Sequence, residues 1–97
     1  MNRHKDGEAM RALLDYLKEK LGSDWEECPP SGIPGLSTNG LKARHNAILD
    51  AVAKDDATPL GRDKLYGARE FPDWRQMCIE LEDELSRRNE PFRKVPW

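Results

Sequence analysis

Residues 71–89 read FPDWRQMCIELEDELSRRN and have the clearest helical pattern in the chain. Apolar residues recur there at intervals of three and four, which stacks them along one side of an α-helix. They are Trp74, Met77, Cys78, Leu81 and Leu85. Asp73 and Gln76 have the spacing of a capping box, in which each side chain bonds a backbone N–H at the helix start. The pattern predicts a helix over 73–88 that begins at Asp73, with Pro91 limiting its extension.

Residues 7–21 carry a second apolar stripe with the same offsets. It consists of Met10, Leu13, Leu14, Leu17 and Leu21. Two stripes of equal pitch and length can pack along each other. We therefore expect helices 7–21 and 73–88 to form the long pair of the fold, with Gly22 ending the first helix as a C-cap glycine.

Two further helices are predicted between these segments. Residues 40–54 follow a Ser37 or Thr38 cap, and their stripe is Leu41, His45, Ile48, Leu49 and Val52. A short helix over 59–69 starts with proline at its first position, where no backbone N–H is needed. The prediction is a single all-α domain, 1–97, of three to four helices, with 40–54 across the long pair and 59–69 as a short connector.

The composition indicates one globular, soluble domain. The 97 residues are 37% hydrophobic and 35% charged, with a formal net charge of −2. A chain so close to neutral does not attract nucleic acid or anionic membrane over its whole surface. No apolar run is long enough to span a bilayer, and the start MNRHKDGE lacks a signal-peptide core. We expect a cytoplasmic protein.

Residue types that carry enzyme chemistry are sparse. Nucleophilic catalysis needs a cysteine or serine beside a base, and the histidines are His4, near the amino terminus, and His45, in a helical stripe. Cys28 and Cys78 are expected to be unpaired thiols, either of which can meet His45 in space. No two of these four residues have the close spacing of a structural zinc site, and the acidic run 82–84 is expected on a solvated face. The sequence predicts no enzyme activity, no cofactor and no metal.

Two proline-bearing segments carry large apolar residues. They are the loop 23–36, SDWEECPPSGIPGL, and the tail 90–97, EPFRKVPW. Prolines exclude regular helix and favour extended chain. The apolar side chains either cover the helical core or form docking segments for a partner. The candidate partner-binding residues are Trp25, Pro29, Pro30, Ile33, Leu36, Phe92, Arg93, Lys94 and Trp97.

Lack of catalytic groups together with tryptophan-bearing irregular segments favours a regulatory or inhibitory interaction module. Tryptophan and arginine are enriched at interface hot spots. The expected partner is a larger protein or complex, and proteins that mobile elements direct against a host machine are of this kind. A second copy of the chain can also complete an apolar helical seam.

Nucleic-acid binding is the alternative, because helices at 40–54, 59–69 and 73–88 have the order of a helix-turn-helix or winged-helix domain. The candidate contacts are Arg62, Lys64, Arg69, Arg87, Arg88, Arg93 and Lys94. The helix 73–88 is acidic, and phosphates would repel it. The sequence therefore ranks this alternative second.

Overall fold

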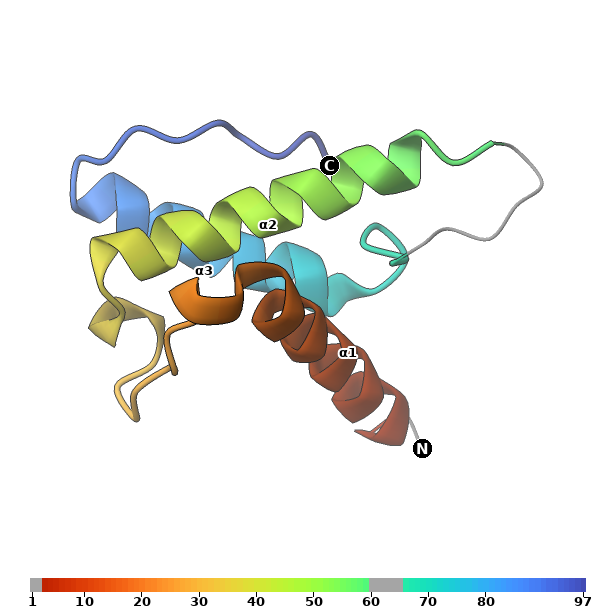
Figure 1. Ribbon diagram of the computed structural model, residues 1–97, viewed down its shortest axis with the longest axis horizontal. Coiled ribbons are helices and arrows are strands. Elements are labelled where there is room, and N and C mark those ends of the chain that lie inside the picture. Colours follow the sequence, from red (N-terminus) through yellow and green to blue (C-terminus); the bar gives the residue numbers. More distant parts are fainter. Residues whose placement is uncertain (1–2, 60–65) are drawn as a thin grey trace.

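The computed structural model describes the backbone of residues 3–59 and 66–97 and the side chains of residues 11–59 and 66–97. Its helices are α1 (Arg3–Leu21), α2 (Thr38–Asp56) and α3 (Pro72–Arg87), with 3₁₀ turns at Gly22–Asp24 and Ile33–Gly35 (Figure 1). No strand occurs in the described residues, so the predicted all-α class is confirmed. Within those ranges, no helix combines the length and the apolar character needed to cross a membrane.

The helix starts follow from local chemistry. Ser37 is the N-cap of α2, and its hydroxyl accepts a hydrogen bond at 3.0 Å from the backbone N–H three residues on, as predicted. α3 begins at Pro72 with Phe71 as N-cap and no side-chain cap bond, so the predicted capping box of Asp73 with Gln76 is wrong. Proline has helical φ and no N–H to satisfy, so it can start the helix itself. Asp73 then lies in the first turn, where the helix dipole favours an acid.

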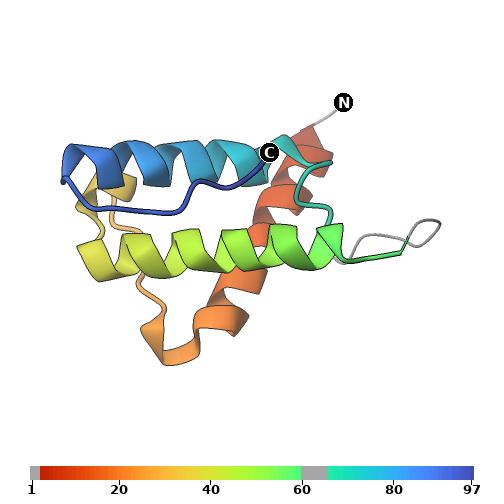
Figure 2. The ribbon, with the colours of Figure 1, turned by 90° about the horizontal axis from the view of Figure 1, so that it is seen from above.

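α2 and α3 run antiparallel and side by side, and α1 crosses one face of this pair (Figure 2). The chain after α3, residues 88–97, returns between the two helices on the opposite face. We call residues 90–97 the C-terminal tail. The predicted long pair of 7–21 with 73–88 is therefore wrong, because α2 is the neighbour that runs alongside α3. Stripes of equal pitch leave the pairing of three helices open, and consecutive helices are usually adjacent in space.

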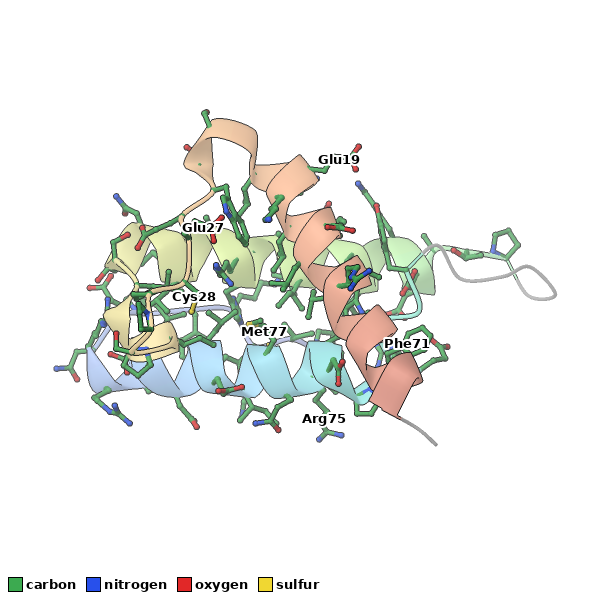
Figure 3. The ribbon with its side chains drawn as sticks, turned by 90° about the horizontal axis from the view of Figure 1, so that it is seen from below. Glu19, Glu27, Cys28, Phe71, Arg75 and Met77 are labelled. Carbon is green, nitrogen blue, oxygen red and sulfur yellow. The ribbon has the colours of Figure 1, made fainter. Side chains whose placement is uncertain are left out.

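The predicted stripes supply most of the core. Met77 lies between α2 and α3 and points inward, beneath α1 (Figure 3). The fully or almost fully buried side chains of the three stripes are Leu13, Leu17, Leu41, His45, Ile48, Val52, Trp74, Cys78, Leu81 and Leu85. Each large apolar side chain that is fully buried contributes about 1.5–3 kcal/mol. The inward face of each helix is therefore the one that its periodicity indicated.

The predicted fourth helix, 59–69, falls mainly on residues 60–65, which lie outside the described residues. Arg62 and Lys64 lie there too. Its described end, residues 66–69, forms a bend and turn instead of a helix.

Asp55, near the end of α2, holds that turn in place. One carboxylate oxygen accepts from the backbone N–H of Tyr66 at 2.9 Å, and the other accepts from that of Ala68 at 2.8 Å. Between them Gly67 has φ +66°, a value that favours glycine. The turn leads directly into α3, so Asp55 ties the end of one helix to the start of the next.

Candidate functional site

The loop 23–36 packs much of its apolar surface onto the core. Ile33 and Leu36 are 9% and 2% exposed, so both belong to the core rather than to the accessible surface. Pro29 is half-buried and Pro30 is exposed. Of these four candidate contacts, the prolines alone can meet a partner in this conformation.

Arg44 ties the same loop to α2. Its side chain is buried, and its Nη2 donates to the backbone carbonyl of Glu26 at 2.9 Å. The guanidinium lies 4.4 Å from the ring centroid of the half-buried Trp25, a cation–π contact. Burial lowers the pKa of Arg44. The Glu26 carbonyl and the Trp25 ring of the loop thus hold the buried guanidinium of Arg44 on α2. Trp25 is therefore engaged within the fold.

The C-terminal tail packs against both α2 and α3. Val95 is 5% exposed, and Phe92 and Trp97 are half-buried against the core. The rings of Phe92 and His45 form a T-shaped contact with 5.4 Å between centroids, and the backbone carbonyl of Trp97 accepts a hydrogen bond from Arg69. The exposed cations of the tail are Arg93 and Lys94. The tail therefore covers the core and presents its charges to solvent.

Several candidate nucleic-acid contacts are already paired with acids. Arg69 lies 2.9 Å from Asp56. Arg87 and Arg88 bind the two oxygens of the buried Glu84 at 3.1 and 2.8 Å. Cations held by carboxylates are less available to neutralise phosphates, the contacts on which nucleic-acid affinity depends.

A groove lies between α3 and the tail. Its main pocket has a volume of about 350 Å³ and is lined by Arg75, Ile79, Glu82, Asp83, Ser86, Phe92, Lys94, Val95 and Trp97. A second pocket of about 250 Å³ shares two of these residues, and its lining is Arg69, Glu70, Pro72, Arg75 and Trp97. We call the two pockets together the α3–tail groove. Figure 3 shows Arg75 pointing away from α2, so the groove opens along the outer edge of α3.

Two large apolar side chains are exposed, one in the groove and one at the turn before α3. Phe71 is 46% exposed and Ile79 is 41% exposed, and no other large apolar side chain among those described reaches this level. Ile79 lines the groove, and Phe71 lies at the start of α3 (Figure 3). Sequence reasoning singled out neither residue. The available signal was an isoleucine at a position of the helix outside its buried stripe.

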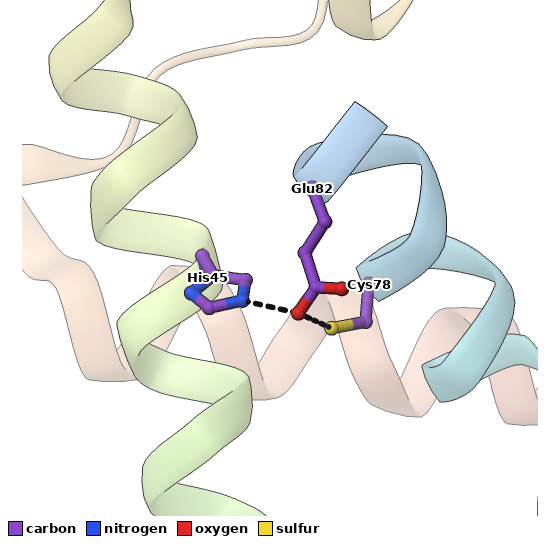
Figure 4. A group of neighbouring side chains, drawn as sticks. All are labelled: His45, Cys78 and Glu82. Atoms are coloured by element: carbon purple, nitrogen blue, oxygen red, sulfur yellow. Dashed lines mark hydrogen bonds and ion pairs between the residues drawn. The ribbon is translucent and has the colours of Figure 1, made fainter. Parts of the chain in front are cut away.

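Three chemically different side chains meet between α2 and α3 (Figure 4). His45 comes from α2, and Cys78 and Glu82 lie one turn apart on α3. Glu82 Oε2 is 2.8 Å from His45 Nε2 and 3.4 Å from Cys78 Sγ, and the three atoms all lie within 4.8 Å of one another. The backbone N–H of Val95 donates to the same oxygen at 3.4 Å. We call His45, Cys78 and Glu82 the His–Cys–Glu cluster.

The cluster is a buried hydrogen-bonded network centred on one carboxylate. The side chains of His45 and Glu82 are 2% and 13% exposed. A carboxylate can only accept, so His45 Nε2 and the Cys78 thiol are the donors. Burial, and then the Glu82 carboxylate, raise the pKa of Cys78 to about 12, which keeps the thiol protonated at neutral pH. Cys28, the other free cysteine, is exposed in the loop.

The cluster differs from the expectation that residues 82–84 form a solvated acidic run. Glu84 is buried, the Glu82 side chain is only 13% exposed, and Asp83 is exposed. The sequence allowed His45 and Cys78 to meet but did not include Glu82. The spacing of four residues between Cys78 and Glu82, which places both on one side of a helix, was the signal that pointed to it.

The residues of the groove and of the cluster carry the functional argument, because comparison with known proteins adds no relative. No protein-family model matches the chain, no curated protein sequence matches it, and no solved structure matches its fold.

Proposed function

We infer that this chain is a small regulatory interaction module that binds a segment of a larger protein in the α3–tail groove. One observation carries the proposal: the side chain of Ile79 is 41% exposed and lines the α3–tail groove. A large apolar side chain exposed in a concave surface is typical of an interaction site. Trp97 and Arg75 line both pockets, and their residue types are enriched at interface hot spots.

Two unpaired cations in the groove suit carboxylates on a partner segment. Arg75 and Lys94 are exposed, and neither forms an ion pair with another described residue. The exposed acids of the groove are Asp83 in the main pocket and Glu70 in the second pocket. A segment that places an apolar side chain against Ile79 and Trp97, with carboxylates beside the two cations, would be complementary to this surface.

The sequence predicted the loop 23–36 and the C-terminal tail as the partner-binding segments. The proposed contact surface retains the tail, but α3 takes the place of most of the loop. Ile33 and Leu36 support the core, and the ring of Trp25 is engaged with Arg44. The outer edge of α3, by contrast, has accessible apolar area. A partner can therefore bind there without unpacking the fold.

The test is binding to a partner isolated by affinity capture from the source organism and then purified. We expect Ile79→Asp to weaken that complex by at least about tenfold, because hot-spot truncations cost more than roughly 1 kcal/mol and a buried unpaired charge adds to this. Ala12→Asp adds the same charge to an exposed position of α1, on the opposite face, and should change the affinity by less than about twofold. Circular dichroism confirms that both variants fold.

Two outcomes would contradict the proposal. Equal binding of the wild type and Ile79→Asp would remove the groove as the contact surface. Binding of mixed-sequence duplex DNA that weakens steeply with added salt would show phosphate contacts and favour the nucleic-acid alternative.

A further inference from the structure

We propose that the His–Cys–Glu cluster is a binding site for one divalent transition-metal ion, with Zn²⁺ as the ion that suits its ligands. The site does not depend on the interaction proposed above. Its three candidate ligand atoms are His45 Nε2, Cys78 Sγ and Glu82 Oε2, all within 4.8 Å of one another. The sequence predicted no metal, because no two of its histidines and cysteines are closely spaced and Glu82 was expected on a solvated face.

The kinds of ligand atom select the ion. Zn²⁺ binds imidazole nitrogen, thiolate sulfur and carboxylate oxygen. Mg²⁺ and Ca²⁺ prefer sets made of oxygen alone. A set of one nitrogen, one sulfur and one oxygen ligand around a single ion therefore favours zinc. Co²⁺ is the usual spectroscopic substitute for Zn²⁺ in such sites.

Two of the three distances are close to those of a tetrahedral site, and the third, between His45 Nε2 and Cys78 Sγ, is at most 4.8 Å. Zinc–ligand bonds of about 2.0–2.3 Å place neighbouring ligand atoms roughly 3.3–3.6 Å apart. The Cys78–Glu82 distance of 3.4 Å already falls in that range. The His45–Glu82 distance of 2.8 Å needs to open by about half an ångström to admit the ion. Binding also requires His45 Nε2 and Cys78 Sγ to approach from at most 4.8 Å to about 3.6 Å.

The fold holds these ligands on rigid elements. Two ligands lie one turn apart on α3 and the third lies on α2, so the packing of two core helices sets the geometry. The Val95 N–H already bonds the Glu82 carboxylate, as outer partners of metal ligands do. Glu82 also lines the α3–tail groove, which gives an ion and a fourth, water ligand a route from solvent.

Binding exchanges protons for the metal. The Cys78 thiol loses its proton to solvent, and the ring proton of a neutral His45 lies on Nδ1 so that Nε2 can donate its lone pair. The two positive charges of the ion then balance one thiolate and one carboxylate. A charge-neutral group satisfies a buried site better than separate charges do.

The experiment is a titration of the purified full chain with Co²⁺, followed by its thiolate-to-cobalt charge-transfer absorption. We expect saturation at one equivalent and loss of the band when Zn²⁺ is added. Cys78→Ser should abolish the band, while Cys28→Ser, which changes the exposed cysteine, should keep it. Glu82→Gln should weaken binding by about 100-fold or more, because even outer-shell changes cost 10–100-fold. Zn²⁺ should also raise the thermal midpoint of the wild type and of Cys28→Ser, but not of Cys78→Ser.

Circular dichroism of each variant separates loss of metal from loss of fold. If Cys78→Ser reduces helicity, Glu82→Gln decides the question, because it keeps the shape of the side chain. A band that survives Cys78→Ser, or one that disappears in Cys28→Ser, would place the metal elsewhere and overturn the proposal. Absence of any band at one equivalent would leave the cluster as a hydrogen-bonded network and also overturn it.

Discussion

Glu26 shows how one side chain in an irregular segment can fix the start of a helix. Its carboxylate accepts hydrogen bonds from the backbone N–H of Ser37 at 2.7 Å and from the Ser37 hydroxyl. That hydroxyl in turn caps α2. These bonds to Ser37 hold the pKa of Glu26 below its usual value. One acid thus joins the loop to the first turn of α2.

We expect Glu26 to make part of the stability depend on pH. Because its folded pKa is lowered, the carboxylate stabilises the fold above the unfolded pKa, near 4.5, and this contribution is lost as pH falls through the folded pKa. Glu26→Gln should therefore reduce the loss of stability between about pH 7 and about pH 3, measured by urea unfolding at both. Glu80→Gln, at an exposed position of α3, is the control. A wild-type pH dependence in Glu26→Gln would contradict this role.

The His–Cys–Glu cluster shows how much of a site can be predicted from the periodicity of apolar residues. The stripes assigned His45 and Cys78 to the inward sides of their helices, and both are buried. A stripe identifies a face, but it does not identify the residue opposite. The contact of His45 with Glu82 joins positions 37 apart and depends on how α2 and α3 align. Acidic neighbours made Glu82 look solvated, although its helical position differs from that of Asp83 by about 100°.

The elements were predictable to different degrees for physical reasons. Spacing of apolar residues located all three helices, because burial on one side imposes that spacing. The start of α3 was missed because Pro72 supplies helical backbone without a side-chain cap. Composition showed that the loop 23–36 and the C-terminal tail must place large apolar groups somewhere. Composition cannot separate a cover on the core from a docking segment, since both need the same residues.

We expect deletion of residues 91–97 to destabilise the fold. The deletion exposes the surface that Val95, Phe92 and Trp97 now cover. The free energy of unfolding should fall by about 2–4 kcal/mol, which corresponds to one fully and two partly buried side chains. Urea unfolding measures this change, and Lys94→Ala, at an exposed position of the tail, should change stability by less than about 0.5 kcal/mol. Unchanged stability of the truncated chain would show that the tail contributes little to the core.

The whole molecule is organised in layers, with α1 on one face of the α2–α3 pair and the C-terminal tail on the other (Figure 2). The pair therefore has apolar contacts on two sides, which explains why every member of the α3 stripe is buried. The sequence supplied the apolar faces and the all-α class. It did not supply the order of the layers, which depends on how three similar helices divide their contacts.

A pair of substitutions two residues apart tests this arrangement. Leu81 is fully buried, so Leu81→Ala should lower the free energy of unfolding by about 2–5 kcal/mol. Ile79 is 41% exposed, and Ile79→Ala should cost less than about 1 kcal/mol. Thermal unfolding separates them, because each kcal/mol shifts the midpoint of a domain of this size by about 4–8 °C. Equal shifts would contradict the orientation of α3.

The three tryptophans occupy three different parts of this layered molecule. Trp74 is 2% exposed in the core, Trp25 lies in the loop against Arg44, and Trp97 lies in the tail beside the groove. Indole emission depends on the local polarity and on nearby quenching groups, so the three rings should differ in wavelength and intensity. Replacing two of them with phenylalanine leaves a single emitter. Three such proteins would follow the loop, the core and the tail separately by light emission, without an added dye.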